Sequence, residues 1–293
     1  MFSTSDKPLI MGILNVTPDS FSDGGRFNDV TSALHQVEKM LSDGADIIDI
    51  GGESTRPYSI SVSSGEQVQR VIPIITAIRT QLSTTALISI DTRLSTVAKL
   101  ALAEGANIIN DISAGQTDPH ILEVAAHYNC PIILMHIQGT PQTMQDNPSY
   151  DNVVSEVMAS LSISVDKAKQ AGISPDKIIL DPGIGFGKTI EHNLTLLAHL
   201  NQLVNMGYPI MLGTSRKKFL STITGADKPE NLALATAITS SLAVMAGVKI
   251  VRVHDVKENR QALDISWAIK QAALNSSPVA SLHPLIRGNN EAN

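Results

Sequence analysis

A short unit recurs along the chain, in which an amphipathic helical pattern ends at a glycine and an Ile- and Val-rich run follows almost at once. Five such joints are DGADIIDIGG, EGANIINDIS, AGISPDKIILDPG, MGYPIMLGTS and AGVKIVRVHD, with their glycines at Gly44, Gly105, Gly172, Gly207 and Gly247. Glycine supplies the left-handed conformation that ends a helix, and a short uninterrupted apolar run is typical of a strand buried on both faces. The chain is therefore expected to alternate helices with buried strands.

Three further apolar runs, LIMGILNV, ALISIDT and PIILMH, bring the expected strands to eight. They begin near residues 9, 45, 86, 107, 131, 177, 209 and 250. Strict alternation with right-handed crossovers predicts parallel pairing, and eight repeats is the number that closes an α/β (β/α)8 TIM barrel. The alternative is an open doubly wound sheet. Such a sheet would gather its polar residues at one switch point, whereas here polar residues follow all eight runs.

The organisation of the chain is that of a single domain. No Pro/Ser-rich or charged linker divides its 293 residues, so we expect an N-terminal tail at 1–8, the barrel at 9–274 and a C-terminal tail at 275–293. Apolar residues make up 43% of the chain and aromatic residues only 3%. This aliphatic composition suits parallel strands covered by helices.

Composition also limits the class of partner and the compartment. A net charge of −6 argues against a broad nucleic-acid-binding surface, and no apolar run reaches the roughly 18 residues of a membrane span. The N-terminus lacks the basic segment and cleavage pattern of a secretion signal. The lone Cys130 begins an apolar run, which indicates a buried structural thiol. We therefore expect a cytoplasmic protein that binds small molecules, with neither nucleic acid nor membrane as a partner.

The carboxyl ends of barrel strands carry the active site, so polar residues there are the candidates. Asp91 and Asp181 each end an apolar run, where an unpaired carboxylate is costly. Together with Asn110 they match the NH2, ring NH and carbonyl edge of an aminopyrimidine-like heterocycle, and Lys217 can donate to that carbonyl. For each acid alone, capping of the next helix or pairing with an Arg or Lys is the alternative.

A second group of strand-end residues has the preferences of a phosphate site. It comprises Asn15, Arg56, Arg252 and His254, with the hydroxyl of Thr55. Arg binds phosphate oxygens bidentately, and an Asn oxygen can hold Mg2+ beside them. Ordinary surface pairing is the alternative, and it is more plausible for Arg56 than for Arg252 and His254, which alternate out of an apolar strand.

Two local patterns qualify this assignment. Met135 and His136 are adjacent and cannot both face inward on a regular strand. We favour Met135 as a pocket wall. For His136, a structural hydrogen bond is at least as plausible as a ligand role. The segment DPGIGFGKT lacks the GxxxxGK[ST] spacing of a nucleotide loop, and we interpret its glycines as shaping a loop that places Phe186 over a ligand. The loops NVTPDSFSDGGRF and GGESTRPYS are candidate lids.

Eight segments of the chain carry a family resemblance, in this order: MGILNVTPDSFSDGG, GADIIDIGGESTRP, SIDT, NIINDIS, MHIQGTPQTMQ, DPGIGFGKT, GTSRK and VRVHDV. Through them the chain resembles the dihydropteroate synthases over almost its whole length. The resemblance implies a (β/α)8 barrel, usually dimeric, that acts in folate biosynthesis. Such an enzyme condenses 6-hydroxymethyl-7,8-dihydropterin diphosphate with p-aminobenzoate to 7,8-dihydropteroate and pyrophosphate, with Mg2+ as the ion.

The resemblance also implies roles for residues at the matching motifs. Those that would hold or wall the pterin are Asp91, Asn110, Ile112, Met135, Asp181, Phe186, Lys217 and Arg252. Those that would hold the diphosphate are Asn15, Thr55, Arg252 and His254, with Asn15 as the metal ligand. Those that would form the p-aminobenzoate site are Arg56, Pro57, Phe186, Ser215, Lys217 and Lys218. The catalytic set would be Asp23, Asp91, Asp181 and Lys217.

Two positions depart from the family pattern. Tyr58 follows Arg-Pro where small residues are common, and Lys218 stands where Ser is frequent, so the departures bear on amine recognition and leave the pterin pocket unchanged. A pterin-dependent methyltransferase would share the pocket without binding diphosphate, and the basic SRK and VRVH segments favour the synthase over it. A Schiff-base aldolase using Lys217 and a non-catalytic pterin-binding barrel are also compatible with these residues.

Overall fold

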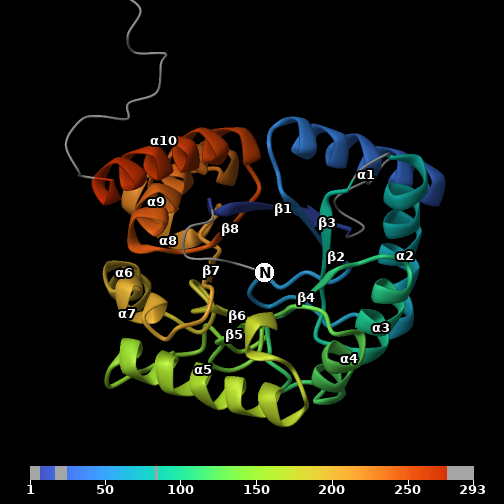
Figure 1. The fold of residues 1–293 in the computed structure, drawn as a ribbon, viewed down its shortest axis with the longest axis horizontal. Helices are drawn as coiled ribbons and strands as arrows, with labels where there is room; N and C mark the ends of the chain where they lie inside the picture. Colours follow the sequence, from blue (N-terminus) through green and yellow to red (C-terminus); the bar gives the residue numbers. More distant parts are fainter. Residues whose placement is uncertain (1–6, 17–24, 83–84, 276–293) are drawn as a thin grey trace, which may run out of the picture.

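Eight strands, each parallel to its neighbours, alternate with helices in this computed structural model, which describes residues 7–16, 25–82 and 85–275 (Figure 1). The strands are β1 (Leu9–Asn15), β2 (Ile47–Gly51), β3 (Leu87–Asp91), β4 (Ile108–Asp111), β5 (Ile132–Met135), β6 (Ile178–Asp181), β7 (Met211–Leu212) and β8 (Ile250–Val253). Each begins within two residues of its predicted position, so the local apolar pattern located all of them.

Helices surround the strands as an outer ring (Figure 1). They are α1 (Gly25–Ser42), α2 (Ser64–Gln81), α3 (Ser95–Ala103), α4 (His120–Tyr128), α5 (Val153–Gln170), α6 (Ile190–Ala198), α7 (Leu200–Val204), α8 (Lys218–Thr224), α9 (Ala233–Ala246) and α10 (Val256–Leu274), with the 3-10 turns η2 (Pro175–Lys177) and η3 (Pro229–Leu232). Among the described residues, none of these helices is both long and apolar enough to cross a bilayer.

The sheet closes on itself. Its hydrogen-bonded order runs β6-β5-β4-β3-β2-β1-β8-β7, which leaves β6 and β7 as the two ends. A parallel bridge between Leu180 and Ile210 joins those ends, and the Leu180 N–H donates to the Pro209 carbonyl at 2.9 Å. The predicted (β/α)8 barrel is therefore confirmed over the open doubly wound sheet.

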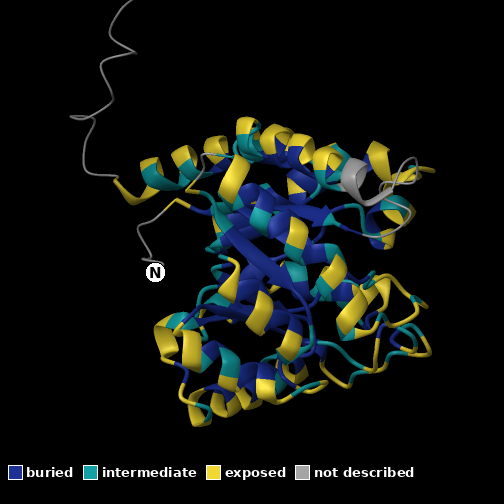
Figure 2. Cartoon of the chain, turned by 90° about the vertical axis from the view of Figure 1, so that its right-hand side faces the viewer, coloured by how far each residue is buried: buried dark blue, intermediate teal, exposed yellow. Residues whose placement is uncertain are grey.

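The apolar core has two parts, one on each face of the sheet. Between sheet and helices lies the larger cluster, and in Figure 2 the buried strands run beneath helices whose outer faces are exposed. Inside the barrel, a layer at the amino ends of the strands is filled by Met11, Ile47, Ile108, Ile133, Ile179, Met211 and Ile250. Two residues further along, the same inward faces carry Asp49, Asn110, Asp181 and Arg252, because side chains alternate along a strand. The apolar layer thus forms the floor of a polar site.

The helix ends follow the sequence pattern. All five predicted glycines have positive φ, from 84° to 108°. Helix α4 begins at His120. Asp118 caps its start by accepting from the His120 N–H at 3.2 Å, and it also accepts from the Ser95 N–H at 2.8 Å. The buried position of Cys130 is confirmed, at 7% exposure.

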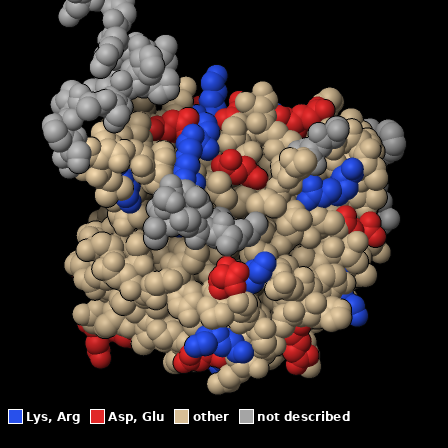
Figure 3. Space-filling view, in the orientation of Figure 1, with Lys and Arg blue, Asp and Glu red and all other residues tan. Residues whose placement is uncertain are grey.

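Several sequence expectations fall outside the described residues. These are Asp23, most of the first candidate lid loop, and almost all of the predicted tails at 1–8 and 275–293. Within the described part, charged side chains of both signs are interspersed on the face drawn in Figure 3. A broad uncharged area covers the left of that face, where Figure 1 places α6 and α7.

Candidate active site

A buried cluster of charged side chains occupies the centre of the barrel. The Arg252 guanidinium, on β8, donates from Nε to Asp49 Oδ2 at 2.6 Å and from Nη2 to Asp91 Oδ2 at 2.7 Å. Asp49 Oδ2 also accepts from Asn110 Nδ2 at 3.1 Å. Among the described residues, Asp49 Oδ1 and Asn110 Oδ1 are buried with no hydrogen-bond partner. These two acceptors are available to a ligand that brings N–H donors.

The protonation of this cluster reflects burial and crowding. Burial raises the pKa of Asp91 to about 7, because the carboxylate loses its hydration. Arg252 opposes that rise, whereas the negative charge of Asp49 adds to it. One positively charged guanidinium therefore pairs with two buried carboxylates, so the cluster can bind a further cation or N–H donor.

Asp181 and Lys217 form a second part of the site, beside Phe186. Burial raises the pKa of Asp181, with Lys217 opposing, and burial lowers the pKa of Lys217 to about 8, with Asp181 opposing. Lys217 Nζ lies 4.4 Å from the centre of the Phe186 ring and donates to the Ile184 carbonyl. The ammonium thus stands over an aromatic face, an arrangement that favours the charged form.

The loop that carries Phe186 lies directly against the end of β5. A Cβ atom at Gly183 would come within 1.9 Å of the His136 carbonyl oxygen, and one at Gly187 within 2.4 Å of the Gln138 carbonyl oxygen. Both glycines have positive φ, 67° and 60°. Only glycine meets the steric and conformational demands together, which explains why this loop is glycine-rich without being a nucleotide loop.

The end of β8 and the segment after β7 meet through hydrogen bonds. Ser215 Oγ accepts from the His254 N–H at 3.0 Å and pairs with His254 Nδ1 at 3.0 Å. Arg216 donates from Nε and Nη2 to the two carboxylate oxygens of Asp255, at 3.1 and 2.6 Å. Burial, with help from Arg252, lowers the pKa of His254 to about 3, so its imidazole is neutral near pH 7. Ser215 orients that ring.

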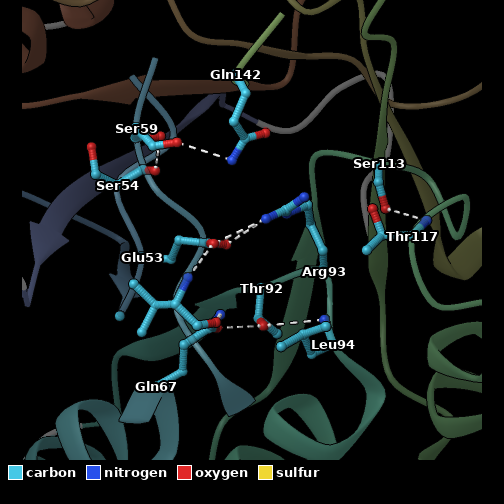
Figure 4. Close-up of polar contacts among 12 residues, drawn as sticks. Glu53, Ser54, Ser59, Gln67, Thr92, Arg93, Leu94, Ser113, Thr117 and Gln142 are labelled. Atoms are coloured by element: carbon cyan, nitrogen blue, oxygen red, sulfur yellow. Dashed lines mark hydrogen bonds and ion pairs between the residues drawn. The ribbon is translucent and has the colours of Figure 1, made fainter. Parts of the chain in front are cut away.

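The loop at residues 52–63 is anchored from beneath by an ion pair (Figure 4). Arg93 Nη2 donates to both carboxylate oxygens of Glu53, at 3.0 and 2.8 Å, and Glu53 Oε1 also accepts from the Val62 N–H at 2.9 Å. On the other side, Gln142 Nε2 donates to the Ser59 carbonyl at 2.9 Å. These contacts hold the loop at both ends.

The remaining predicted site residues fall into three sets. Ile112 and Met135 are buried, at 5% and 2% exposure, as pocket walls would be. Asn15 and Thr55 are half-buried, at the end of β1 and in the anchored loop. Arg56, Pro57 and Lys218 are exposed. The structure therefore gathers the pterin residues closely, and it leaves three of the six predicted amine-binding residues on the rim.

Sequence reasoning missed two buried charges. Asp49 interrupts the apolar run IIDIG, the same signal that singles out Asp91 and Asp181, but the site residues predicted near that strand, including Thr55 and Arg56, all follow Gly51. Lys188 belongs to the glycine loop, and its Nζ lies 2.9 Å from His136 Nδ1. The structural hydrogen bond considered for His136 is thus present.

Comparison with known proteins identifies the family. The model of the pterin binding enzymes matches residues 11–254. The chain belongs to that family. A dihydropteroate synthase of Synechocystis is 47% identical, over 92% of this chain and 92% of its own length. The Yersinia pestis dihydropteroate synthase, solved with a sulfonamide drug, superposes with a TM-score of 0.86 at 41% identity, covering 92% of this chain and 97% of that one.

A third match comes from Xanthomonas albilineans, a dihydropteroate synthase solved with 7,8-dihydropteroate. Its TM-score is 0.82 at 38% identity, covering 92% of this chain and 95% of that one. These relatives place this pterin-binding enzyme among the dihydropteroate synthases, which are transferases, and confirm the resemblance found in the sequence. The methyltransferase and the non-catalytic barrel are not favoured. The substrates are small molecules.

Proposed function

We propose that this enzyme condenses 6-hydroxymethyl-7,8-dihydropterin diphosphate with p-aminobenzoate, giving 7,8-dihydropteroate and pyrophosphate. The observation that carries the proposal is the buried cluster of Asp49, Asp91, Asn110 and Arg252, with an unpartnered acceptor on Asn110. An aminopyrimidine edge brings the donors that this cluster accepts. On this basis Asp91, Asn110 and Asp181 hold the pterin, and Arg252 lies against it.

The reaction begins with departure of the diphosphate. The C–O bond breaks and its electron pair leaves with the diphosphate, while the electron-rich dihydropterin stabilises the methylene cation that remains. Arg252 lies on β8 and His254 directly follows that strand, two residues further along, so they bind the leaving group next to the ring pocket. The carboxylates of Asp91 and Asp181 stabilise the cation because they are buried in a low-dielectric site.

A Mg2+ ion fits the diphosphate side of this site. Asn15 ends β1 with a half-buried side chain at the barrel mouth, and Mg2+ typically takes one or two protein oxygens and completes its shell with phosphate oxygens and water. When bound, Mg2+ neutralises charge on the departing diphosphate. We assign Asn15 as the protein ligand, with Thr55 beside the phosphates.

The second step joins the amine. The aniline nitrogen of p-aminobenzoate attacks the methylene cation, a C–N bond forms, and the nitrogen loses a proton to water or to the released pyrophosphate. No covalent enzyme intermediate is needed. The neutral amine needs no strong base, so Lys217 acts by binding rather than as a nucleophile, and Phe186 forms a wall shared by both substrates. Arg56, Pro57, Ser215 and Lys218 complete the p-aminobenzoate site, with Asp23 from the first loop.

Positional isotope exchange tests this order of events. Pterin diphosphate carrying 18O in the C–O–P bridge is incubated with enzyme and Mg2+, with and without p-aminobenzoate. With the amine, we expect one pyrophosphate released for each dihydropteroate formed. Without it, reversible ionisation should move the 18O label from the bridge into non-bridging positions. If the label stays in the bridge while the complete reaction turns over, direct displacement by the amine replaces the cationic route.

We also propose that the enzyme acts as a homodimer. Helix α9 exposes an apolar stripe at helical spacing, Leu234, Ile238, Leu242 and Met245, with exposures from 45% to 73%. Helix α10 packs beside it and exposes Ile265 and Ile269 (Figure 1). An exposed apolar stripe along two neighbouring helices is typical of a protein interface.

Sedimentation analysis tests the dimer. Wild type should sediment as a dimer and Leu242→Asp as a folded monomer. Ile163→Asp, which places the same charge on an exposed isoleucine of α5, is the matched control and should stay dimeric. A wild-type monomer, or a Leu242→Asp protein that remains dimeric, contradicts the assignment.

A cytoplasmic location completes the proposal. Its support is the single Cys130, whose thiol is buried and free. Burial raises the pKa of that thiol to about 11, so it stays protonated and unreactive. Fractionation of cells producing the protein should recover the activity in the cytoplasmic fraction.

A further inference from the structure

The loop that carries Phe186 also contains a lysine with a buried side chain, and none of the proposed substrate-binding roles uses it. Lys188 is only 3% exposed. Its ammonium group donates to His136 Nδ1 at 2.9 Å, to the Gly183 carbonyl at 2.9 Å and to the Phe186 carbonyl at 3.0 Å. All three N–H groups of the ammonium are therefore used.

The charges around Lys188 explain how this contact works. Burial, with help from Lys188, lowers the pKa of His136 to about 3, so the imidazole is neutral and Nδ1 accepts. Burial lowers the pKa of Lys188 to about 7; Asp181 opposes this shift and Lys217 adds to it. A methionine would fill the same volume without the desolvation cost of a charge. The buried amino group therefore points to a task beyond filling space.

The contacts define that task. His136 follows β5, whereas Gly183 and Phe186 belong to the loop between β6 and α6, so the hydrogen bonds of the ammonium link the two segments. The linked loop also contacts two groups of the candidate site. The Gly183 N–H donates to Asp181 Oδ1 at 2.7 Å, and the Phe186 ring lies 4.4 Å from Lys217 Nζ.

We propose that Lys188 is a positioning residue for both substrates: its ammonium holds the Gly183–Phe186 backbone on His136, and so sets the Phe186 ring and the Asp181 carboxylate. The inference rests on the proposed binding roles of Phe186 and Asp181. Lys188 itself contacts neither substrate in this scheme. Its loss therefore acts through Phe186 and Asp181, so Lys188 and Phe186 should be energetically coupled in the binding of p-aminobenzoate.

A double-mutant cycle tests the coupling. KM for each substrate and kcat are measured for wild type, Lys188→Met, Phe186→Ala and the double variant, with unfolding in urea as the stability readout. Lys169→Met, the same change at an exposed position of α5, is the control and should match wild type. We expect Lys188→Met to raise KM for p-aminobenzoate about tenfold, because a loop displaced by about an ångström misplaces the shared wall.

The cycle separates the inference from the proposed function. The KM of the double variant for p-aminobenzoate should be little higher than that of Phe186→Ala alone, since Lys188 acts on this substrate through that ring. If the two single effects on this KM multiply, or if Lys188→Met lowers stability while both KM values and kcat stay at wild type, Lys188 has only a structural role. If Phe186→Ala itself leaves both KM values unchanged, it is the proposed binding role of Phe186 that fails.

A pair of His136 variants keeps the test decisive if Lys188→Met does not fold. His136→Asn places an amide oxygen near the position of Nδ1 and retains the acceptor, whereas His136→Leu removes it. We expect His136→Asn to keep KM for p-aminobenzoate near wild type, and His136→Leu to raise it severalfold at unchanged folding. Equal KM values in the two variants overturn the proposal.

Discussion

Gly183 offers the sharpest test of how the site is built. A Cβ atom there would lie 1.9 Å from the His136 carbonyl oxygen, whereas ordinary contact begins at 3.4 Å. The obstacle is backbone and cannot rotate away. That backbone is held in turn, because the His136 N–H donates to the Asp181 carbonyl at 3.0 Å. Gly183→Ala therefore has to move the loop.

The magnitude follows from comparison with Gly207, which also has positive φ, 84°, but has nothing within 4 Å of an added Cβ. Gly207→Ala meets only the left-handed penalty, roughly 1–2 kcal/mol, offset by roughly 0.4–1 kcal/mol from the stiffer unfolded chain. Gly183→Ala adds overpacking, which is about 1–3 kcal/mol in well-packed sites. We expect Gly183→Ala to lose about 1–3 kcal/mol more stability than Gly207→Ala.

Urea denaturation of the two variants measures this difference, and steady-state pyrophosphate release measures the functional effect. Because the loop must shift by about an ångström, Gly183→Ala should lose about a hundredfold in kcat/KM, and Gly207→Ala should keep wild-type kinetics. Equal losses of stability in the two variants would refute the steric argument. A Gly183→Ala enzyme with normal kinetics would show that the loop can relax without moving the site.

Three further predictions concern charge and strain around the site. Asp181→Asn and Lys217→Ala should each lose most activity, at least about a hundredfold in kcat/KM, while circular dichroism shows a folded protein; near-normal kinetics in either removes its pterin role. Since burial lowers the pKa of Lys217 to about 8, the ammonium is present below that pH and lost above it, so calorimetric affinity for pterin should decline from pH 7 to pH 9, and a flat profile contradicts this. Tyr58 has a positive φ of 64°, so the free energy of unfolding of Tyr58→Gly in urea should equal or exceed that of wild type. Because Tyr58 departs from the family pattern beside the predicted p-aminobenzoate site, the same variant should shift sulfonamide affinity more than KM for p-aminobenzoate, and equal shifts contradict this role of Tyr58.

Asp49 was not predicted as a site residue, although the sequence carries a signal for it. A carboxylate inside the run IIDIG carries the same signal as Asp91, and period-two alternation places it on the face of Ile47, which points into the barrel. The signal was therefore present. Whether Asp49 lies in the active-site layer depends on the stagger between neighbouring strands in the closed barrel. That stagger cannot be predicted from the sequence of any one strand.

The contacts of the anchored loop at residues 52–63 were harder still to predict from the sequence. Its composition suggested a lid, but its contacts come from Arg93, 40 residues from Glu53, and from Gln142, 83 residues from Ser59. Neither partner follows a local pattern that points to the loop. Only the neighbouring positions of the loops in the folded barrel bring them together (Figure 4).

The amino-acid sequence by itself determined the eight strands, the glycine-ended helices and the family, because apolar periodicity, helix termination and ordered motifs are local properties. The tertiary structure decided which charges meet. Arg252 lies 203 residues from Asp49 and 161 from Asp91, yet closure sets β8 beside β1 and turns all three side chains inward. The pairing of buried charges depends on that closure and on strand register, and it exists only once the barrel is formed.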